Sequence, residues 1–210
     1  MRFPSLSVPG TSRFLVLAGV SLALITLVVG ASPAEAHHLL ELTGLAPTPA
    51  TGLLSGLAHP ILGPDHLLFL CSLSLVGLNQ RARWMLALLA MGLTGSALGL
   101  LLPGLPGAEA AVAFSLVVVA MVWWGHWPKV LLLPAIALHG YVLSDAVLGW
   151  SRAPLAFYGL GLLVSQGALL LLALTVLRSF ADALSPQRRT VLCAALVGCG
   201  AAWTWSALVA

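Results

Sequence analysis

Six long apolar segments constrain this chain more than any other feature of its sequence. Only 7% of its 210 residues are charged and 60% are hydrophobic, whereas soluble domains carry about 25% charged residues. So few charges cannot cover a water-soluble globule. Segments approaching the roughly 20 residues of a helical span lie at Gly52–Leu78, Trp84–Leu102, Glu109–Trp124, Val130–Gly149, Leu155–Leu177 and Val191–Val209. The sequence predicts an all-α, polytopic membrane helix bundle with six transmembrane helices.

The first 36 residues have the pattern of a targeting segment. Two arginines precede an apolar run from Phe14 to Val29, and Ala34-Glu35-Ala36 follows it. This small-x-small pattern is the one that signal peptidase cleaves. We predict a signal peptide at 1–36 and a single six-helix transmembrane domain at 37–210. An uncleaved first transmembrane helix is the alternative.

The basic residues between the apolar segments predict an orientation. With residue 37 outside, only Arg152 falls in an external loop, and the internal loops hold Arg81, Arg83, Lys129, Arg178, Arg188 and Arg189. This distribution satisfies the positive-inside rule.

Few ionisable side chains lie inside the apolar segments, and they are the functional evidence. Burying such a group costs several kcal/mol unless it is paired, solvated or bound to a metal. The first group is an H-x5-D-H pattern formed by His59, Asp65 and His66, and the second group is His139 with Asp145. Glu109 opens the third apolar segment.

The first group resembles part of a metal shell. On one continuous helix, His59 and His66 would lie about 10.5 Å apart, with Asp65 turned about 120° away. Two prolines and a glycine within the motif favour a break that folds the three side chains together. Two imidazoles and a carboxylate suit Ni²⁺, Co²⁺, Cu²⁺ or Zn²⁺. The alternative is an ordinary helix N-terminus, which would explain Pro64 and Asp65 but not the two histidines.

The second group repeats the interval of the first, because Asp145 follows His139 by six residues. Spans one and four enter the membrane from opposite sides. A 3+3 inverted repeat, with a site where its halves meet, is therefore suggested. Alternatively, His139 is a structural residue that hydrogen-bonds a neighbouring helix through Tyr141 or Ser144.

A mature chain that begins at His37-His38 would offer an amine and an imidazole, a chelating pair for a late divalent metal. A polar, disordered tail is the alternative for this pair.

Several classes of function lack their sequence signals. No Lys/Arg cluster exceeds two adjacent residues, which argues against a nucleic-acid partner. No phosphate-binding G-x-x-x-x-G-K-[ST] and no H-E-x-x-H motif is present, so neither ATP hydrolysis nor zinc hydrolase chemistry is expected. The cysteines form no C-x-x-C pair and are interpreted as small core residues.

The segment Gly56–His66 resembles the HupE/UreJ family of membrane proteins, because it matches the family pattern H-P-x-x-G-x-D-H. The resemblance extends to Glu109 followed by Ala113 and Ser115, and to His139-Gly140-Tyr141. It is closest to the cyanobacterial form, in which an initial His-His pair and a fifth-span glutamine like Gln166 are familiar. Many relatives have a histidine where this chain has Leu143 and a glutamate where it has Asp145.

The resemblance implies a bacterial inner-membrane permease for a divalent transition-metal ion, with nickel first and cobalt or copper as alternatives. Such a protein supplies metal to urease or hydrogenase and is not itself an enzyme. It binds no permanent cofactor, and its partners are the bilayer and the transported metal ion. The H-x5-D-H site would face the periplasm. A metal-binding accessory protein without transport is the alternative. The expected metal residues are His59, Asp65, His66, His139 and Asp145, with His37, His38, Glu109 and Tyr141 as accessory residues.

We expect signal peptidase to expose the amine of His37. Mass spectrometry of the purified protein should find a chain that begins at this residue. A retained leader would contradict the prediction and remove the chelating amine.

Overall fold

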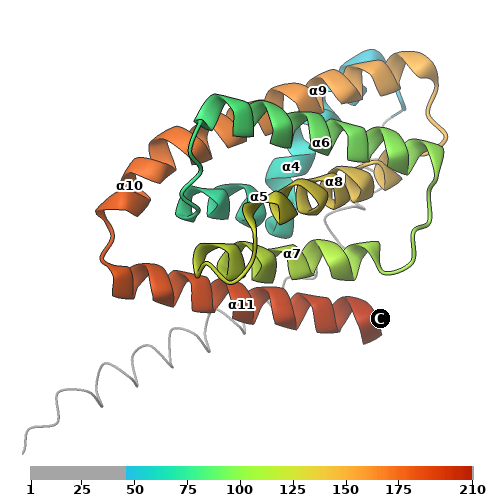
Figure 1. Cartoon of the computed structure of the whole chain (residues 1–210). Coiled ribbons are helices and arrows are strands. Elements are labelled where there is room, and N and C mark those ends of the chain that lie inside the picture. The colour runs from blue at the N-terminus through green and yellow to red at the C-terminus, as the bar shows by residue number, and fades with distance from the viewer. Residues whose placement is uncertain (1–45, 210) are drawn as a thin grey trace, which may run out of the picture.

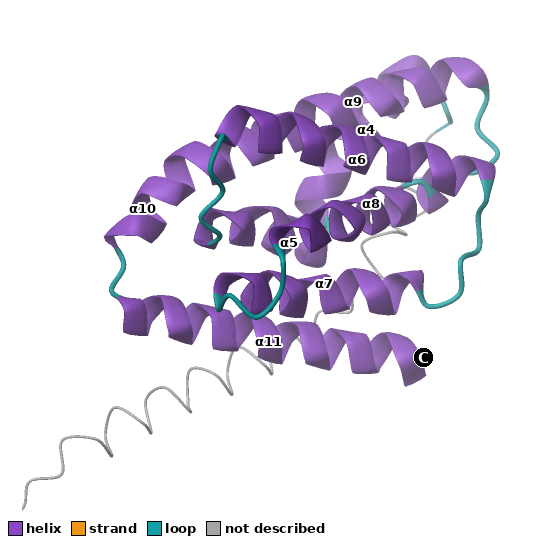
Figure 2. Ribbon diagram, in the orientation of Figure 1, coloured by secondary structure: helices purple, strands orange, loops and turns teal. Residues whose placement is uncertain are grey.

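The computed structural model describes residues 46–209, and the regular elements of this part are all helices (Figure 2). The predicted signal peptide and His37-His38 lie outside the described residues. The main helices are α4 (Pro49–Leu62), α5 (Pro64–Ser72), α6 (Arg81–Leu101), α7 (Ala108–Trp123), α8 (Leu132–Leu143), α9 (Arg152–Leu171), α10 (Arg178–Ala183) and α11 (Pro186–Val209). Short helical turns η1 (Leu73–Leu75), η2 (Lys129–Leu131) and η3 (Asp145–Val147) extend or join them.

Four continuous helical segments are long and apolar enough to cross a membrane. They are Arg81–Leu101, Lys129–Val147, Arg152–Ala183 and Pro186–Val209. α7 is apolar but has only 16 residues. The fifth predicted segment runs beyond Leu177, because the π-helical segment η4 (Leu172–Leu177) connects α9 to α10 without a break.

The first predicted span is divided into two helices. α4 ends at Leu62, Gly63 is extended (φ −73°, ψ 109°), and α5 begins at Pro64. The residue before a proline is biased away from helical backbone angles, so this interruption follows from the sequence. A single continuous helix over Gly52–Leu78 is therefore excluded.

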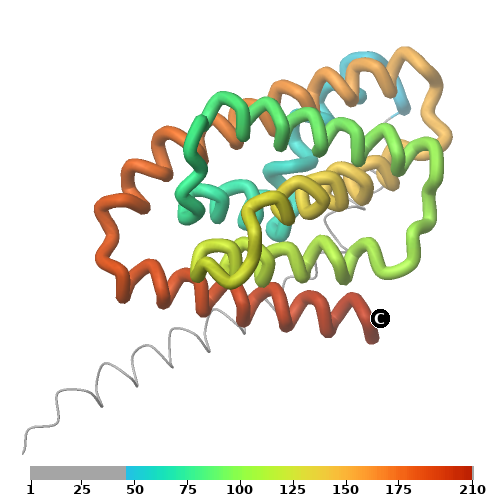
Figure 3. Tube along the Cα trace, viewed as in Figure 1, coloured from blue at the N-terminus to red at the C-terminus, as the bar shows by residue number. Residues whose placement is uncertain are grey.

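The helices form a bundle in which α5 and α8 are central. α7 and α11 lie side by side along one side of this pair, and α6 and α9 lie on the other (Figure 1, Figure 3). Large apolar side chains cover the outside, including Leu101, Phe180 and Trp205, which are 75%, 67% and 68% exposed. An outer surface of this kind suits a hydrocarbon environment.

Glycines allow two helix pairs to approach closely. A Cβ at Gly52 or Gly56 of α4 would collide with backbone oxygens of α9, and one at Gly161 of α9 would lie 2.5 Å from the Leu53 oxygen. α6 and α8 pack in the same way, because a Cβ at Gly95 would collide with the Ala137 oxygen. Such small-residue contacts drive helix association in lipid. Gly99 of α6 makes a third such contact with α8, because its Cβ would collide with the Tyr141 oxygen.

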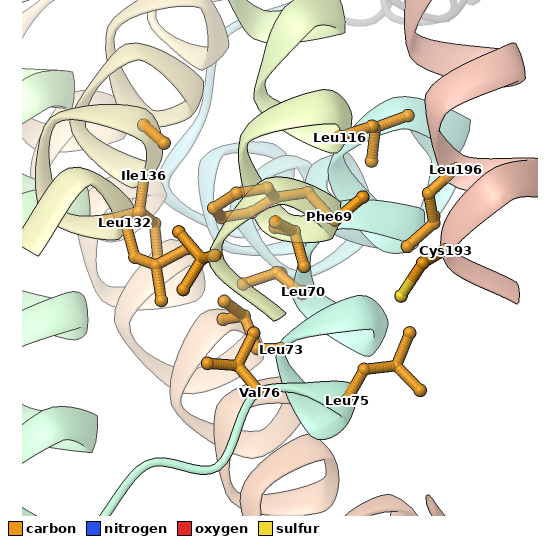
Figure 4. Close-up of a cluster of buried hydrophobic side chains, with 14 of the residues drawn as sticks. Phe69, Leu70, Leu73, Leu75, Val76, Leu116, Leu132, Ile136, Cys193 and Leu196 are labelled. Carbon is orange, nitrogen blue, oxygen red and sulfur yellow. The ribbon is translucent and has the colours of Figure 1, made fainter. Parts of the chain in front are cut away.

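The buried apolar core is centred on α5 and its continuation η1. Figure 4 shows Phe69, Leu70 and Leu73 among side chains from α7, α8 and α11. Cys193 and Cys199 of α11 are part of this core, as expected for small core residues, whereas Cys71 of α5 is only half-buried. The core fixes α5 against its neighbours and with it the start of the helix, where Asp65 and His66 lie.

Basic side chains gather at the C-terminal end of α5 and η1. Nη1 of Arg178 donates to the oxygens of Ser74 and Leu75, both at 3.3 Å. Nζ of Lys129 donates to the oxygen of Gly77. These cations meet the carbonyl end of a helix, where positive charge is favoured. Two residues assigned to internal loops by the positive-inside rule thus share one end of the bundle.

We expect Gly95→Ala to separate α6 from α8, because the added methyl group collides with the Ala137 backbone. Overpacking of this kind costs about 1–3 kcal/mol. The melting temperature in detergent should fall, whereas Gly159→Ala, whose Cβ meets nothing within 4 Å, should leave it unchanged or raise it. Equal effects of the two substitutions would contradict the close-packing explanation.

Candidate metal centre

The helix break places the two ends of the H-x5-D-H motif in one buried region. Pro60 has no N–H, so the oxygen of Gly56, four residues earlier, lacks its normal helical donor. The hydroxyl of Ser165 on α9 supplies one at 3.0 Å. The N–H of Gly63 then closes α4 by donating to the oxygen of His59 at 3.1 Å. The proline and glycine of the motif are thus accommodated by specific hydrogen bonds.

His59 is oriented by Tyr158 of α9. The Tyr158 hydroxyl donates to the oxygen of Leu143 and lies 3.0 Å from Nδ1 of His59. Because the hydroxyl hydrogen is engaged with Leu143, Nδ1 must carry the proton and the Nε2 atom carries the lone pair. Imidazoles that bind metals are commonly fixed in one tautomer by such a second bond.

Asp65 orients His66 in the same way. Its Oδ1 atom accepts bonds from Nδ1 and from the backbone N–H of His66, both at 2.8 Å. Nδ1 therefore carries a proton, and in the neutral imidazole the lone pair of His66 lies on Nε2. Asp65 lies in the first turn of α5, where the helix dipole also favours a carboxylate. Its charge is held next to an imidazole, and both residues are almost fully buried.

His139 of α8 lies against His66. Their ring centroids are 4.6 Å apart in an edge-to-face arrangement. Phe69 stacks on the His139 ring, with 4.3 Å between the ring centroids. Nε2 of His139 is 2.8 Å from the Ser115 hydroxyl of α7. The structural alternative for His139 names Tyr141 or Ser144 as its link to a neighbouring helix, but the hydrogen-bonding partner is Ser115.

Three histidines from three helices therefore form one cluster. His59 and His66 are stacked at 6.4 Å between ring centroids, and His66 contacts His139. These rings are 5%, 1% and 4% exposed, and Asp65 is 2% exposed. Within the described residues, no three His, Cys, Asp or Glu side chains already have the arrangement of a metal site. Binding an ion requires side-chain adjustments within this cluster.

A small cavity adjoins the cluster. Its volume is about 10 Å³, which is about the space that one water-sized sphere occupies. The lining residues are Pro60, His66, Leu70, Ile136, His139, Leu143 and Gln166. An ion could therefore reach both His66 and His139 with little displacement of the surrounding helices.

Other predicted site residues are not members of this cluster of three histidines and Asp65. Asp145 is exposed in the turn η3 beyond α8, and Glu109 is half-buried in the first turn of α7. The hydroxyl of Tyr141 donates to the oxygen of Leu102 at 2.5 Å and accepts from the N–H of Leu105 at 2.9 Å. Tyr141 thus holds the connection between α6 and α7. His37 and His38 lie outside the described residues.

Two residues of the site, Tyr158 and Ser115, were not predicted as partners of the histidines from the sequence, in which Ser115 has a place only in the family pattern. Tyr158 is 2% exposed and Ser115 is 1% exposed. Their position within apolar segments of the sequence was one signal, because polar side chains in apolar helices generally require hydrogen-bond partners. Their partners, however, are 99 and 24 residues away in sequence, and only the packing of α4 on α9 and of α7 on α8 reveals them.

The described fold and cluster define an all-α protein with helices suited to a membrane and a buried imidazole–carboxylate site. A family model described as "HupE / UreJ protein" matches residues 22–203. The chain therefore belongs to the HupE/UreJ family. Comparisons with curated proteins and with solved structures found no match.

We expect Tyr158→Phe to weaken metal binding by the His59–His66 pair about 10–100-fold, the usual effect of losing an outer-shell partner. Titration of the purified protein with Co²⁺ measures it. Tyr141→Phe is the matched control, because it also removes a buried hydroxyl that donates to a backbone oxygen, and that hydroxyl bonds backbone groups rather than a histidine among the described residues. Equal Co²⁺ affinity in the two variants would show that Tyr158 does not orient a ligand.

Proposed function

We propose that this chain is a membrane permease for a divalent transition-metal ion, with nickel as the first candidate and cobalt and copper as alternatives. It would supply the metal to enzymes such as urease or hydrogenase. The family, which is linked to nickel and cobalt handling for these enzymes, supports the general role. The observation that carries the proposal for this chain is the buried cluster of His59, Asp65, His66 and His139.

The hydrogen bonds in the cluster suit a ligand role. Tyr158 and Asp65 each engage the Nδ1 atom of a histidine, so the lone pairs of His59 and His66 lie on Nε2. Imidazole nitrogens suit nickel, copper and zinc. A group of this polarity inside an apolar bundle is a functional candidate by default. The Asp65 carboxylate contributes negative charge that offsets dehydration of a dication.

The pairing of the helices supports an inverted repeat. α4 packs on α9, α6 on α8, and α7 on α11. If α4–α7 and α8–α11 are the two halves, α4 corresponds to α8, α6 to α9, and α7 to α11. Exchanging corresponding helices then converts the α4–α9 pair into the α8–α6 pair and leaves the α7–α11 pair unchanged. The first helix of each half supplies a histidine to the cluster. Sites of transporters with such repeats lie where the halves meet.

The basic end of the bundle supports the predicted orientation. Lys129 and Arg178 lie together around the C-terminal end of η1, and Arg189 joins Arg178 through Asp182. We assign this end to the cytoplasm by the positive-inside rule. The ion would then pass inward from the H-x5-D-H site, driven by a gradient, the membrane potential or a partner protein.

A metal-binding accessory protein without transport is the second candidate. The enclosed position of the cluster favours it, since ions bound there are shielded from solvent by surrounding helices. The same position also suits a transport intermediate. Flux measurements separate the two functions, because an accessory protein binds metal without moving it.

We expect proteoliposomes of the purified protein to accumulate Ni²⁺ or Co²⁺, with and without an imposed potential, and alanine at His59, Asp65 or His66 to abolish uptake. Asp65→Asn should be nearly as damaging, because it removes the charge. His139→Ala should lower uptake but retain metal binding at the first group. Radiometric uptake and equilibrium binding are the measurements.

His126→Ala is the matched control, because this histidine is exposed in the connection after α7. Its uptake should equal that of the unmodified protein. Normal uptake by all three alanine variants at the first group would refute the permease site. Binding without uptake by the unmodified protein would favour the accessory function. Normal flux in His139→Gln with poor folding of His139→Ala would assign His139 a structural role.

A further inference from the structure

Gln166 is a buried polar residue that the proposed mechanism has not yet used. It lies on α9 and is 3% exposed. Within the part of the chain that the structure describes, its Oε1 atom has no hydrogen-bond partner. Leaving a buried acceptor unsatisfied is costly, and such atoms in native proteins require an explanation.

The surroundings of Gln166 supply an explanation. The side chain lines the small cavity that His66 and His139 also line. Nδ1 of His139 is likewise buried and without a hydrogen-bond partner among the described residues. When Nε2–H of His139 donates to Ser115, this Nδ1 atom carries a lone pair. Two side chains with unsatisfied buried atoms, Gln166 and His139, therefore line the same cavity together with His66.

We propose that Gln166 is a direct ligand of the metal ion, supplying its amide oxygen beside the nitrogens of His66 and His139. The inference rests on the proposed metal-binding function and narrows its substrate class. The donor set contains nitrogen and oxygen, and no sulfur atom lines the cavity. Such a set suits divalent ions such as nickel, cobalt, copper or zinc and disfavours Cu⁺, which thiolate and thioether ligands select.

Gly92 of α6 makes room for this ligand. A Cβ at Gly92 would lie 2.6 Å from Oε1 of Gln166, while its next contacts are at 3.6 Å. An alanine here would therefore displace the end of the glutamine side chain and leave the nearby backbone in place. Gly167 offers the comparison, because its Cβ would meet only Leu89 at 3.8 Å.

The test is a titration of the purified full-length protein in detergent with Co²⁺, followed by the visible d–d absorption of the bound ion. We expect Gln166→Leu to raise the Kd for Co²⁺ at least about tenfold and to change the spectrum. Gln166→His should restore affinity with a different spectrum, because nitrogen replaces oxygen in the shell. Gly92→Ala should weaken binding as Gln166→Leu does, and Gly167→Ala should not.

An unchanged Kd and spectrum in Gln166→Leu would overturn the inference. If that variant fails to fold, Gly92→Ala and Gln166→His provide the test. A Kd and a spectrum equal to those of the unmodified protein in both variants would also overturn the inference. Co²⁺ binding that requires His139 but not Gln166 refutes the ligand role and leaves the proposed function standing. No Co²⁺ binding by the unmodified protein would overturn both.

Discussion

Backbone and side-chain polar groups inside an apolar bundle must be satisfied by the protein itself, and the interruption of the first apolar segment at Gly63 determines how this chain achieves it. The break leaves His59 at the end of α4 and starts α5 with Asp65 and His66. Two of the polar groups near the break find partners, because Ser165 donates to the Gly56 oxygen and Asp65 accepts from His66. The break that interrupts the helical hydrogen bonds therefore also brings the polar residues together.

Close helix packing then supplies the remaining parts of the site. The contact between Gly56 and α9 brings Tyr158 within hydrogen-bond distance of His59 and places Gln166 two turns further along α9. On the other side, glycine contacts hold α6 against α8, which carries His139. The small residues thus have a functional consequence, because they set the separation of the helices that carry the polar groups.

Local signals in the sequence predicted the parts of the fold that depend on neighbouring residues. Pro60, Gly63 and Pro64 predicted the helix break, and the expected approach of His59 to His66 is confirmed at 6.4 Å between ring centroids. The hydrogen-bond partners of the histidines depend on which helices pack together, and the spacing of residues along the sequence does not specify this packing. Asp145 illustrates the limit: its interval from His139 matches the first group, but the chain turns at η3 and leaves this residue exposed.

The position of His66 between two other histidines has a consequence for the proposed transport. Its ring is 6.4 Å from His59 and 4.6 Å from His139, so one imidazole can belong to two successive coordination shells. A permeant ion must be released as well as bound, which favours several incomplete sites over one complete site. Tyr158, Asp65 and Ser115 anchor the three rings from different helices. Relative motion of these helices would therefore change which histidines share the ion, and this couples the proposed movement of the metal to movement of the bundle.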